Sequence, residues 1–374
     1  MDKNSKIFVA GHHGLVGSAI WNNLKVKGYT NLIGKTHKEL DLQDGVAVRN
    51  FFDREKPEYV ILAAAFVGGI MANSLYRADF IYRNLQIQQN VIGESFRHHV
   101  KKLLFLGSTC IYPKNAPQPM KEDALLSSPL EFTNEPYAMA KIAGLKMCES
   151  FDMQYGTDYI AVMPTNLYGP NDNFNLETSH VMPAMMRKMI LAKALLKKDM
   201  DFVKKDLNKR PVEGVSGLDS DKDIIAILNK YGIYNDHLDL WGSGKPLREF
   251  LWSEEMADAS VFVLENVSYK DVNGLPSELQ GLTTEQIRDN GFNIPEVRNC
   301  HINVGTGKEL TIKELSEKIK SQINYKGDIR WDSSKPDGTM RKLIDVSKLH
   351  SLGWHHKVEI DQGVARLYDW YLKN

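Results

Sequence analysis

The first half of the chain alternates short apolar runs with longer segments whose apolar residues recur at helical spacing. The apolar runs, each short enough for a buried strand, are 6–10, 31–34, 59–65, 101–108 and 159–164. The helical patterns cover 15–28, 78–99 and 135–156. This alternation predicts an α/β fold with a doubly wound parallel sheet. Ligands of such sheets bind beyond the carboxyl ends of the strands, so residues just after each run are candidates for a site.

The pattern loosens after Asn166, where turns and then a Met-rich helical segment at 181–198 replace the alternation. We expect a first domain over 1–165, to which about 238–265 returns, and a smaller C-terminal α/β domain over 166–374. Two polar stretches, about 197–236 and 270–299, are expected to be surface insertions, part helix and part loop. On that interpretation, excising most of 200–232 leaves activity within about tenfold.

Composition excludes some classes of protein. With 374 residues the chain can form two domains around a cleft. Lys+Arg and Asp+Glu are both 47, so no global basic field points to nucleic acid or an anionic membrane. The cysteines (Cys110, Cys148 and Cys300) are far apart, which argues against a disulfide frame or structural zinc and for a reducing cytoplasm. We expect no signal peptide and no membrane span, because the apolar runs are too short.

A glycine-rich stretch, GHHGLVGS at 11–18, follows the first strand and opens the first helix. Glycine allows a tight turn and lets the backbone approach a pyrophosphate closely. The helix N-terminus then offers free N–H groups and positive potential. The stretch therefore predicts a dinucleotide site.

The end of the second strand carries Lys35, Thr36 and His37, and no carboxylate comes before Glu39. Enzymes that use NAD usually place an acid here for the ribose. A positive turn that carries hydroxyl groups suits a 2′-phosphate instead. We therefore expect NADP rather than NAD.

Two further patterns carry side chains suited to proton transfer. Tyr137 and Lys141, in YAMAK, share one face of a helix, where an ammonium would bring the pKa of the phenol toward the working range. Ser108 and Cys110, in GSTCIYP, follow KKLLF, an apolar run typical of the end of a buried strand. If the strand continued, both side chains would face one pocket. A plain oxidoreductase has little need of the thiol.

Together, the glycine loop, the serine and the YxxxK pair resemble the extended short-chain dehydrogenase/reductase family, which modifies nucleotide sugars. In that family Ser, Tyr and Lys hold and protonate a sugar carbonyl beside the nicotinamide. Within the family, the chain most closely resembles the members that epimerise and then reduce GDP-4-keto-6-deoxy-D-mannose. Nearly the whole chain outside the polar stretches carries it, through AGHHGLVGSAI, AAAFVGGI, FLGSTCIYPK, NEPYAMAKIAGLKMCES, MPTNLYGPNDNF, SHVMPA, WGSGKPLREFLW, HINVGTG and SKPDGTMRKLIDV.

This resemblance implies why a thiol follows the serine. Inverting C3 and C5 beside the C4 ketone requires a base on one face of an enolate and an acid on the other. Cys110 matches the base of the family and His180 its partner acid, while Ser108 and Tyr137 would stabilise the enolate. The implied catalytic residues are Ser108, Cys110, Tyr137, Lys141 and His180.

The resemblance also implies the ligand contacts. The residues expected to hold NADP are Gly11, His12, His13, Gly14, Leu15, Val16, Gly17, Lys35, Asp41, Leu42, Ala63, Ala64, Ala65, Leu106, Gly107, Ser108, Thr109, Tyr137, Lys141, Pro164, Thr165, Asn166, Leu167 and His180. Those expected to hold the GDP-sugar are Asn166, Lys188, Trp241, Arg248, Asp337 and Arg341. No metal site is expected, and the family suggests a homodimer through the 78–99 and 135–156 helices.

Some features depart from this pattern or leave alternatives. His13 and His37 stand where relatives usually carry arginine against the 2′-phosphate, and histidine is a weaker cation. A nucleotide-sugar 4-epimerase or 4,6-dehydratase on the same fold is the closest rival. The 4-epimerase needs tightly held NAD, and the dehydratase needs an acidic residue where Cys110 stands. A non-catalytic NADP sensor would be expected to lose Tyr137 or Lys141.

Overall fold

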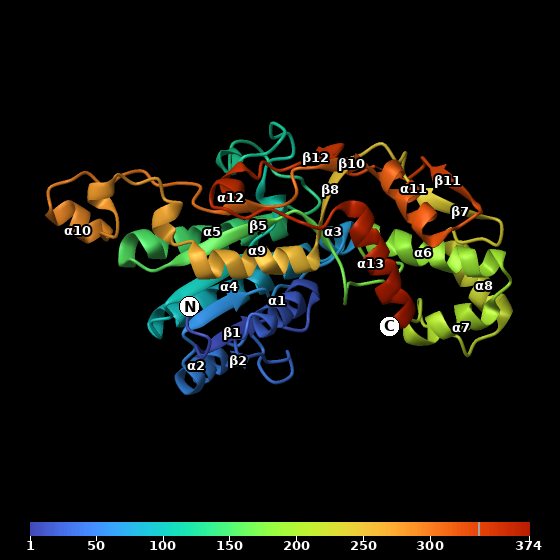
Figure 1. Ribbon diagram of the computed structural model, residues 1–374, viewed down its shortest axis with the longest axis horizontal. Coiled ribbons are helices and arrows are strands. Elements are labelled where there is room, and N and C mark those ends of the chain that lie inside the picture. The colour runs from blue at the N-terminus through green and yellow to red at the C-terminus, as the bar shows by residue number, and fades with distance from the viewer. Residues whose placement is uncertain (336) are drawn as a thin grey trace. The chain divides into compact units, whose positions relative to one another are not determined.

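The computed structural model describes residues 1–335 and 337–374, apart from the side chains of 70 and 71 (Figure 1). Its chain forms two compact units, each built from several segments. The first unit contains Met1–Leu167, Phe250–Gly307 and Leu343–Lys357. The second contains Tyr168–Glu249, Lys308–Lys342 and Val358–Asn374.

A six-stranded parallel sheet forms the centre of the first unit, in the order β2-β1-β3-β4-β5-β9. Its strands are β1 (Ile7–Ala10), β2 (Leu32–Ile33), β3 (Tyr59–Leu62), β4 (Lys102–Leu106), β5 (Tyr159–Pro164) and β9 (Ile302–Val304). The doubly wound parallel fold expected from the apolar runs is therefore confirmed. Strands β1 to β5 lie at the expected places because β-branched and aromatic residues in short apolar runs pack on both faces of a covered sheet, whereas β9 was not among the expected strands.

Helices cover both faces of this sheet. Ile7 and Val9 of β1 pack with α1 and α9, whereas Phe8 and Ala10 pack with α2, α4 and α5 on the other face, as the strand period of two requires. The long helices are α1 (Leu15–Val26), α2 (Gly45–Glu55), α4 (Arg77–Arg97), α5 (Glu135–Tyr155) and α9 (Ser253–Asn266). Shorter ones are α3 (Ile70–Leu75), α10 (Thr284–Asp289) and α12 (Ser347–Ser351), with 3₁₀ turns η1 (Thr109–Ile111), η2 (Glu122–Ala124), η3 (Tyr269–Asp271) and η4 (Ser277–Leu279).

The strand order reverses at β1, which lies between β2 and β3. A reversal of this kind opens a crevice at the carboxyl ends of the two central strands. Gly11 follows β1 there and Ala63 follows β3, with the Ala63 N–H bonded to the Ala10 carbonyl at 3.1 Å. The fold thus places the glycine-rich loop at the point where such sheets bind ligands.

The second unit is a smaller α/β assembly. Its helices are α6 (Val181–Leu196), α7 (Met200–Lys209), α8 (Asp221–Lys230), α11 (Ile312–Ile323) and α13 (Ile360–Lys373). Its strands are β7 (His237–Trp241), parallel to β11 (Asp328–Asp332), and the start of β8 (Leu247–Trp252), flanked by β10 (Glu309–Thr311) and β12 (Arg341–Lys342). The short β6 (Asn166–Tyr168) lies where the chain passes from one unit to the other.

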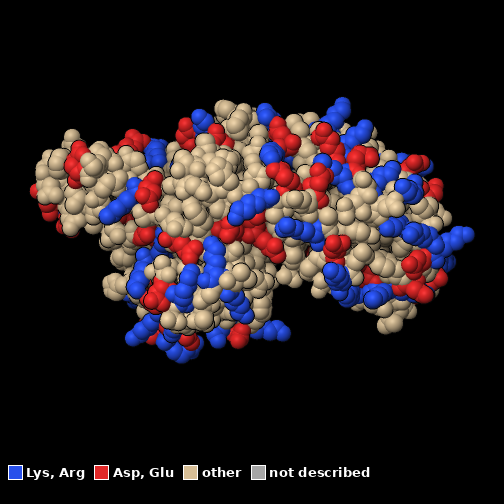
Figure 2. Space-filling model, viewed as in Figure 1, with Lys and Arg blue, Asp and Glu red and all other residues tan. Residues whose placement is uncertain are grey.

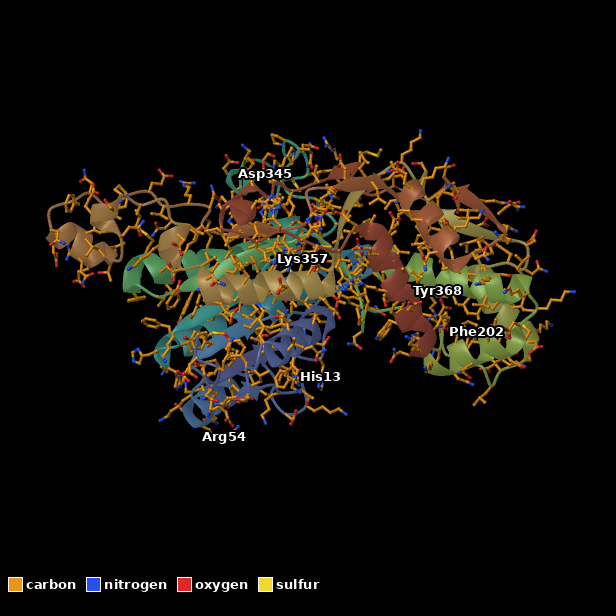
Figure 3. All side chains as sticks on the ribbon, viewed as in Figure 1. His13, Arg54, Phe202, Asp345, Lys357 and Tyr368 are labelled. Atoms are coloured by element: carbon orange, nitrogen blue, oxygen red, sulfur yellow. The ribbon has the colours of Figure 1, made fainter. Side chains whose placement is uncertain are left out.

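The polar stretch 197–236 is not the surface insertion that its composition suggested. Val203 and Leu207 of α7 are fully buried, as is Ile224 of α8. The carboxylate of Asp206 on α7 accepts two hydrogen bonds from the fully buried Arg187 of α6, at 2.8 and 3.0 Å. Figure 3 labels Phe202 on α7 and Tyr368 on α13, and these two helices are joined by the Tyr371–Asp206 hydrogen bond. The segment is therefore part of the core of the second unit.

Neither sign of charge dominates the face of the molecule shown in Figure 2. On the face shown in Figure 2, Lys and Arg are interspersed with Asp and Glu. An anionic ligand must therefore be held by local groups, as the equal totals of the two signs already indicated. None of the helices in the described chain combines the length and apolarity that crossing a bilayer requires.

Candidate active site

The glycine-rich loop turns tightly against the end of β3. Gly11 has φ +85°, and a Cβ there would lie 2.8 Å from the Ala64 nitrogen. At Gly17 a Cβ would lie 2.0 Å from the Gly11 carbonyl oxygen. Both positions therefore require glycine. The third, Gly14, has space for a Cβ, so crowding does not explain it.

Helix α1 begins directly after this loop, with Gly14 at its N-cap. In the described chain no side chain caps the end and no acidic residue lies in the first turn. The first N–H groups and the positive end of the helix are therefore available to a phosphate. The loop and helix fit the pyrophosphate of a dinucleotide.

The turn after β2 carries both signs of charge. The Lys35 ammonium lies 4.0 Å from the Glu39 carboxylate. Glu39 also accepts the Thr36 N–H at 2.8 Å and the Thr36 hydroxyl at 2.7 Å, and these bonds lower the pKa of Glu39. His37 is exposed beside Asp41, at 3.6 Å. Lys35 therefore faces an ionised carboxylate that the sequence interpretation did not take into account.

His12 packs inward at this edge. Its ring lies so close that a Cβ on Gly34 would sit 2.4 Å from it, and the His13 ring centroid is 3.9 Å away. Burial and the His13 charge lower the pKa of His12. His12 is thus neutral at pH 7 and offers hydrogen bonds and packing rather than charge. His13, labelled in Figure 3, is exposed.

The other residues expected to hold the cofactor lie at the same edge of the sheet. Ala63 to Ala65 follow β3, and Gly107 follows β4, where a Cβ would collide with Met163. Thr165 follows β5 and donates its N–H to Val304 at 3.0 Å. Asp41 and Leu42 precede α2. The structure therefore brings the ends of β1, β3, β4 and β5 together around the switch point.

Ser108 and Cys110 do not continue a strand, which corrects the geometric premise of the sequence analysis. β4 ends at Leu106, and Thr109–Ile111 form a 3₁₀ turn with Ser108 at its N-cap. The Ser108 Oγ accepts the Cys110 N–H at 3.3 Å. The turn, not strand alternation, therefore sets how Ser108 and Cys110 lie relative to each other. Since its oxygen accepts this bond, the Ser108 hydroxyl keeps its own proton to donate.

Helix α5 carries Tyr137 and Lys141 on one face. The Lys141 ammonium donates to the Leu106 carbonyl at 2.8 Å and lies 5.8 Å from the Tyr137 ring centroid. Burial lowers the pKa of Lys141 to about 8, opposed by the Cys110 charge. Burial, and then the Cys110 charge, raise the pKa of Tyr137.

The expectation that Lys141 lowers the pKa of Tyr137 is therefore wrong for this structure. The ammonium is directed at the end of β4, and burial outweighs it. A phenol that keeps its proton is suited to donating it to an oxygen on which negative charge develops. Ser108, Cys110, Tyr137 and Lys141 all lie in the first unit, and the charge of Cys110 acts on both other titratable groups.

Asn166 and Leu167 end the first segment of the first unit, and the remaining candidates lie in the second unit. His180 begins α6, and burial together with the Lys342 ammonium lowers the pKa of His180. Lys188 on α6 is buried, and burial lowers its pKa to about 8, opposed by Asp239. Its ammonium lies 5.6 Å from the ring centroid of Trp241, which ends β7 and is 57% exposed. A half-exposed indole beside an ammonium offers a stacking face and a positive charge to a nucleotide.

The side chains of Asp337 and Arg341 form hydrogen bonds with other residues of this chain. Asp337 accepts the Ser243 N–H at 2.9 Å and the Ser243 hydroxyl at 2.6 Å, and these bonds lower the pKa of Asp337. The Arg341 Nε donates to both Glu309 oxygens at 2.9 Å. Arg248 is largely buried, which lowers its pKa. In this structure the Asp337 carboxylate fixes the turn after Trp241 and is not free to accept hydrogen bonds from a guanine base.

Sequence reasoning missed Lys335, whose ammonium also lies 5.6 Å from the Trp241 ring centroid. Its place two residues before Asp337 in SKPDG was the available signal. Among the described residues, no group of three His, Cys, Asp or Glu side chains is arranged to hold a metal ion. No disulfide joins the described cysteines.

Comparison with protein families gives one match, to the NAD dependent epimerase/dehydratase family over residues 7–210. The chain belongs to that family. Among curated proteins it is similar to GDP-L-fucose synthase 1 of Arabidopsis thaliana, with 49% identity covering 100% of this chain and 95% of the relative. It is 44% identical to GDP-L-fucose synthase of Escherichia coli, covering 99% of this chain and 97% of the relative.

Solved structures of the epimerase/dehydratase family agree. A GDP-6-OMe-4-keto-L-xylo-heptose reductase from Campylobacter jejuni is 40% identical, with a TM-score of 0.89 and coverage of 100% and 99%. A GDP-D-glycero-L-gluco-heptose synthase from the same organism, determined in the presence of NADPH, is 40% identical with a TM-score of 0.84 and the same coverage. These similarities support an NADP(H) cofactor, which the loop and the α1 N-terminus fit.

Proposed function

We propose that this protein converts GDP-4-keto-6-deoxy-D-mannose into GDP-L-fucose, by inverting C3 and C5 and then reducing the C4 ketone. The observation that carries the proposal is the position of Cys110, in a 3₁₀ turn that packs against α5, the helix of Tyr137 and Lys141. A reductase alone has no use for a thiol there. Relatives named GDP-L-fucose synthase, similar over the whole chain, support the same reaction.

In the epimerisation, the Cys110 thiolate takes the proton from C3 or C5 and an enolate forms at C4. The Ser108 hydroxyl and the Tyr137 phenol donate hydrogen bonds to the enolate oxygen. His180 returns a proton to the opposite face, so each inversion removes one proton and adds one. Because burial and Lys342 lower the pKa of His180, its imidazole is mostly neutral at pH 7 and returns a proton only after taking one up.

In the reduction, NADPH supplies a hydride to C4 when it is bound. Tyr137 donates its proton to the C4 oxygen, since its raised pKa keeps it protonated in the ground state. Lys141, held on the Leu106 carbonyl, supplies the positive charge that stabilises the phenolate left behind. Gly11, Gly17 and the α1 N-terminus would hold the pyrophosphate.

We further propose that Lys188, Trp241 and Arg248 hold the GDP part of the substrate. Trp241 offers its exposed face to guanine, and the cations offer charge to the diphosphate. Asp337 contributes by fixing Ser243 in the adjacent turn, and Arg341 by its charge near Glu309. Asn166, at the start of β6, would contact the sugar.

A second candidate is a C4 reductase for a GDP-4-keto-heptose. It is favoured by the 40% identity and TM-score of 0.89 with a C. jejuni heptose reductase. The chemistry at C4 would be the same, and only the substituent beyond C5 would differ. Cys110 favours the first candidate because a reductase alone needs no second base.

We also propose a homodimer formed through α4 and α5, in a reducing compartment such as the cytoplasm. Tyr82 on α4 and Met139 and Tyr155 on α5 are exposed, and two long helices packed side by side are a common dimer surface. Light scattering of the purified protein measures the mass directly. A monomeric mass would contradict the dimer.

Product analysis tests the reaction. The protein is incubated with NADPH and GDP-4-keto-6-deoxy-D-mannose, and in parallel with a GDP-4-keto-heptose, and the products are identified by NMR. The proposal expects GDP-L-fucose with one NADPH oxidised per product. Reduction of the hexose without inversion, or turnover of the heptose alone, would favour the second candidate.

A further inference from the structure

Three hydrogen bonds within the 3₁₀ turn that carries Cys110 are long. The Ile111 N–H reaches the Ser108 carbonyl at 3.3 Å, and the Tyr112 N–H reaches the Thr109 carbonyl at 3.4 Å. The Cys110 N–H lies 3.3 Å from the Ser108 Oγ. All three exceed the usual range for N–H···O bonds. The position of the thiol must therefore depend on contacts outside the turn.

Tyr112, two residues after Cys110, provides such a contact. Its side chain is buried, and its hydroxyl lies 2.5 Å from the Asn303 Oδ1 and 2.9 Å from the His301 Nε2. Both partners lie at β9, at the edge of the sheet in the same unit. These bonds are shorter than any within the turn.

The donors and acceptors of this network can be assigned. The Asn303 Nδ2 donates to the carbonyls of Met120 and Asp345, each at 3.1 Å, so the Oδ1 is the atom that faces Tyr112. The Tyr112 hydroxyl therefore donates to Asn303. Its oxygen then accepts the Nε2–H of His301, which burial keeps neutral by lowering the pKa of His301 well below its ordinary value.

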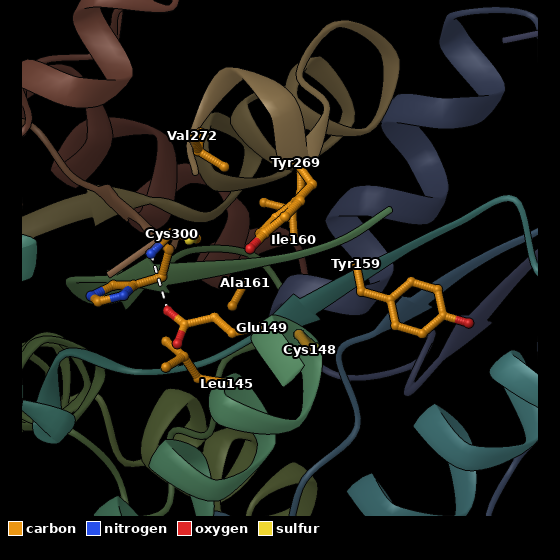
Figure 4. A pocket seen from close by; sticks show the side chains of 10 residues that line it. Leu145, Cys148, Glu149, Tyr159, Ile160, Ala161, Tyr269, Val272 and Cys300 are labelled. Carbon is orange, nitrogen blue, oxygen red and sulfur yellow. Dashed lines mark hydrogen bonds between the residues drawn. The ribbon is translucent and has the colours of Figure 1, made fainter. Parts of the chain in front are cut away.

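The partners of Tyr112 are themselves anchored to the helix that carries the other catalytic candidates. The Cys300 N–H donates to the Glu149 carboxylate on α5 at 3.0 Å, drawn as the dashed line in Figure 4. The Lys348 ammonium donates to the His301 carbonyl at 3.0 Å. Helix α5 also carries Tyr137 and Lys141, so one buried chain of bonds joins α5 to the Cys110 turn.

His301 depends on Tyr112 in return. His301 also lines the small cavity of Figure 4, and its Nδ1 has no hydrogen-bond partner among the described residues. The bond to Tyr112 is thus the polar contact that the imidazole makes through its ring. Losing the Tyr112 hydroxyl would release the turn and leave the Asn303 Oδ1 and the His301 Nε2–H without their hydrogen bonds to it.

We propose that Tyr112 is a positioning residue for Cys110, which its bonds to Asn303 and His301 hold at a fixed place relative to Tyr137 and Lys141. Its hydroxyl is bonded to Asn303 and His301 inside the protein, so it acts on the thiol through the turn. This inference rests on the proposed epimerisation. It makes the proton-transfer step depend on residues at the edge strand β9, whereas the glycine loop follows β1 on the other side of β4.

The test is Tyr112→Phe, which removes only the hydroxyl. We expect deuterium exchange at C3 and C5 of GDP-4-keto-6-deoxy-D-mannose in D₂O to slow at least about tenfold, because small displacements of a catalytic group are costly. The KM for GDP-4-keto-6-deoxy-D-mannose should stay within about twofold of the wild-type value. The rate at which NADP⁺ oxidises GDP-L-fucose should stay within about threefold, since neither quantity depends on the thiol. Alkylation of Cys110 by iodoacetamide, followed by mass spectrometry, should become faster as the turn loosens.

The matched control is Tyr159→Phe, another buried tyrosine of the same unit whose hydroxyl has no partner among the described residues. It should leave every readout unchanged. If Tyr112→Phe does not fold, His301→Leu and His301→Gln replace it, since Gln can still donate to the Tyr112 oxygen. Gln should keep the exchange rate and Leu should lower it.

The inference would be overturned if Tyr112→Phe exchanged deuterium and was alkylated at the same rates as wild type. Equal exchange rates in His301→Leu and His301→Gln would overturn it as well. Failure of the proposed function would look different. The wild-type protein itself would then show neither exchange nor oxidation of GDP-L-fucose, and the alkylation rate would still decide whether Tyr112 holds the turn.

Discussion

Burial sets the protonation states of Tyr137 and Lys141, the two titratable groups that α5 places near the end of β4. It lowers the pKa of Lys141 to about 8 and raises the pKa of Tyr137, so both groups tend toward their neutral forms. The charge of Cys110 favours the charged form of Lys141 and opposes that of Tyr137. At pH 7 the resting site therefore holds a phenol and an ammonium, which suits proton donation at C4.

Lys141→Met should separate activity from stability. We expect the rate of reduction to fall by about 10²–10⁴-fold, the usual contribution of a group in acid–base catalysis. The folded-state pKa of about 8 lies below the ordinary 10.5 of lysine, so the buried charge costs about 3 kcal/mol of folding free energy at neutral pH. This cost applies in full below pH 8 and disappears as the pH rises toward 10.5.

Urea unfolding of wild type and Lys141→Met at pH 7 and pH 10 measures this difference. When the pH is raised from 7 to 10, the free energy of unfolding of wild type should increase relative to that of the variant. Only wild type has the buried lysine whose loss of a proton removes the cost. The unsatisfied Leu106 carbonyl lowers the stability of the variant equally at both pH values and cancels in the comparison. A difference that is independent of pH would contradict the lowered pKa.

Glu39 should weaken the preference for NADPH, because its carboxylate lies 4.0 Å from the Lys35 ammonium. Glu39→Gln keeps an oxygen for the Thr36 N–H and removes the charge. We expect the ratio of kcat/KM for NADPH to that for NADH to rise by about threefold, as is usual for an exposed ion pair. Lys35→Met is the matched control and should lower the ratio. If neither variant moved it, the 2′-phosphate would be held elsewhere.

At the scale of elements, the sequence predicted best what local periodicity determines. Strands β1 to β5 and helices α1, α4 and α5 lie where the apolar pattern placed them, within two or three residues, whereas β9 was not predicted. The turn at Cys110 could not be predicted in the same way, because Tyr112 and Asn303 are 191 residues apart. The sequence placed helix α7 at the surface because of its polar composition. That composition does not reveal that Asp206 pairs with Arg187 on α6.

Asp206→Ala should destabilise the second unit. It leaves the fully buried Arg187 without its carboxylate, a change that typically costs about 3–5 kcal/mol. Asp219→Ala is the control in the same polar stretch, since Asp219 is exposed and bonds only Ser216 in the hydrogen bonds described. Urea unfolding followed by the fluorescence of the tryptophans should show a large shift for Asp206→Ala and little for Asp219→Ala.

Equal stability of these two variants would restore the interpretation of 197–236 as a surface insertion. Excision of most of 200–232 is now expected to prevent folding of the second unit, rather than to leave activity within tenfold. The excision would remove Asp206 together with Val203 and Leu207, all of them buried. Soluble, active protein after excision would contradict the packing described.

At the scale of the whole molecule, the chain places its chemistry on two units. The first contributes the glycine loop and the group of Ser108, Cys110, Tyr137 and Lys141, and the second contributes His180 and the residues around Trp241. Sequence motifs identified these residues because each motif is short and local. Their charge states, and the engagement of Asp337 with Ser243 and of Arg341 with Glu309, depend on burial and on distant partners that no motif contains.

The central claim is that Cys110 is the base of the epimerisation, and deuterium exchange without NADPH tests it most directly. In D₂O the wild-type protein should exchange the hydrogens at C3 and C5 of GDP-4-keto-6-deoxy-D-mannose. Cys110→Ser should nearly abolish exchange, because an alcohol is a far weaker base than a thiolate at neutral pH. Tyr137→Phe, the control, should stop reduction while leaving some exchange. Exchange in Cys110→Ser at the wild-type rate would show that the thiol only fills space in the turn.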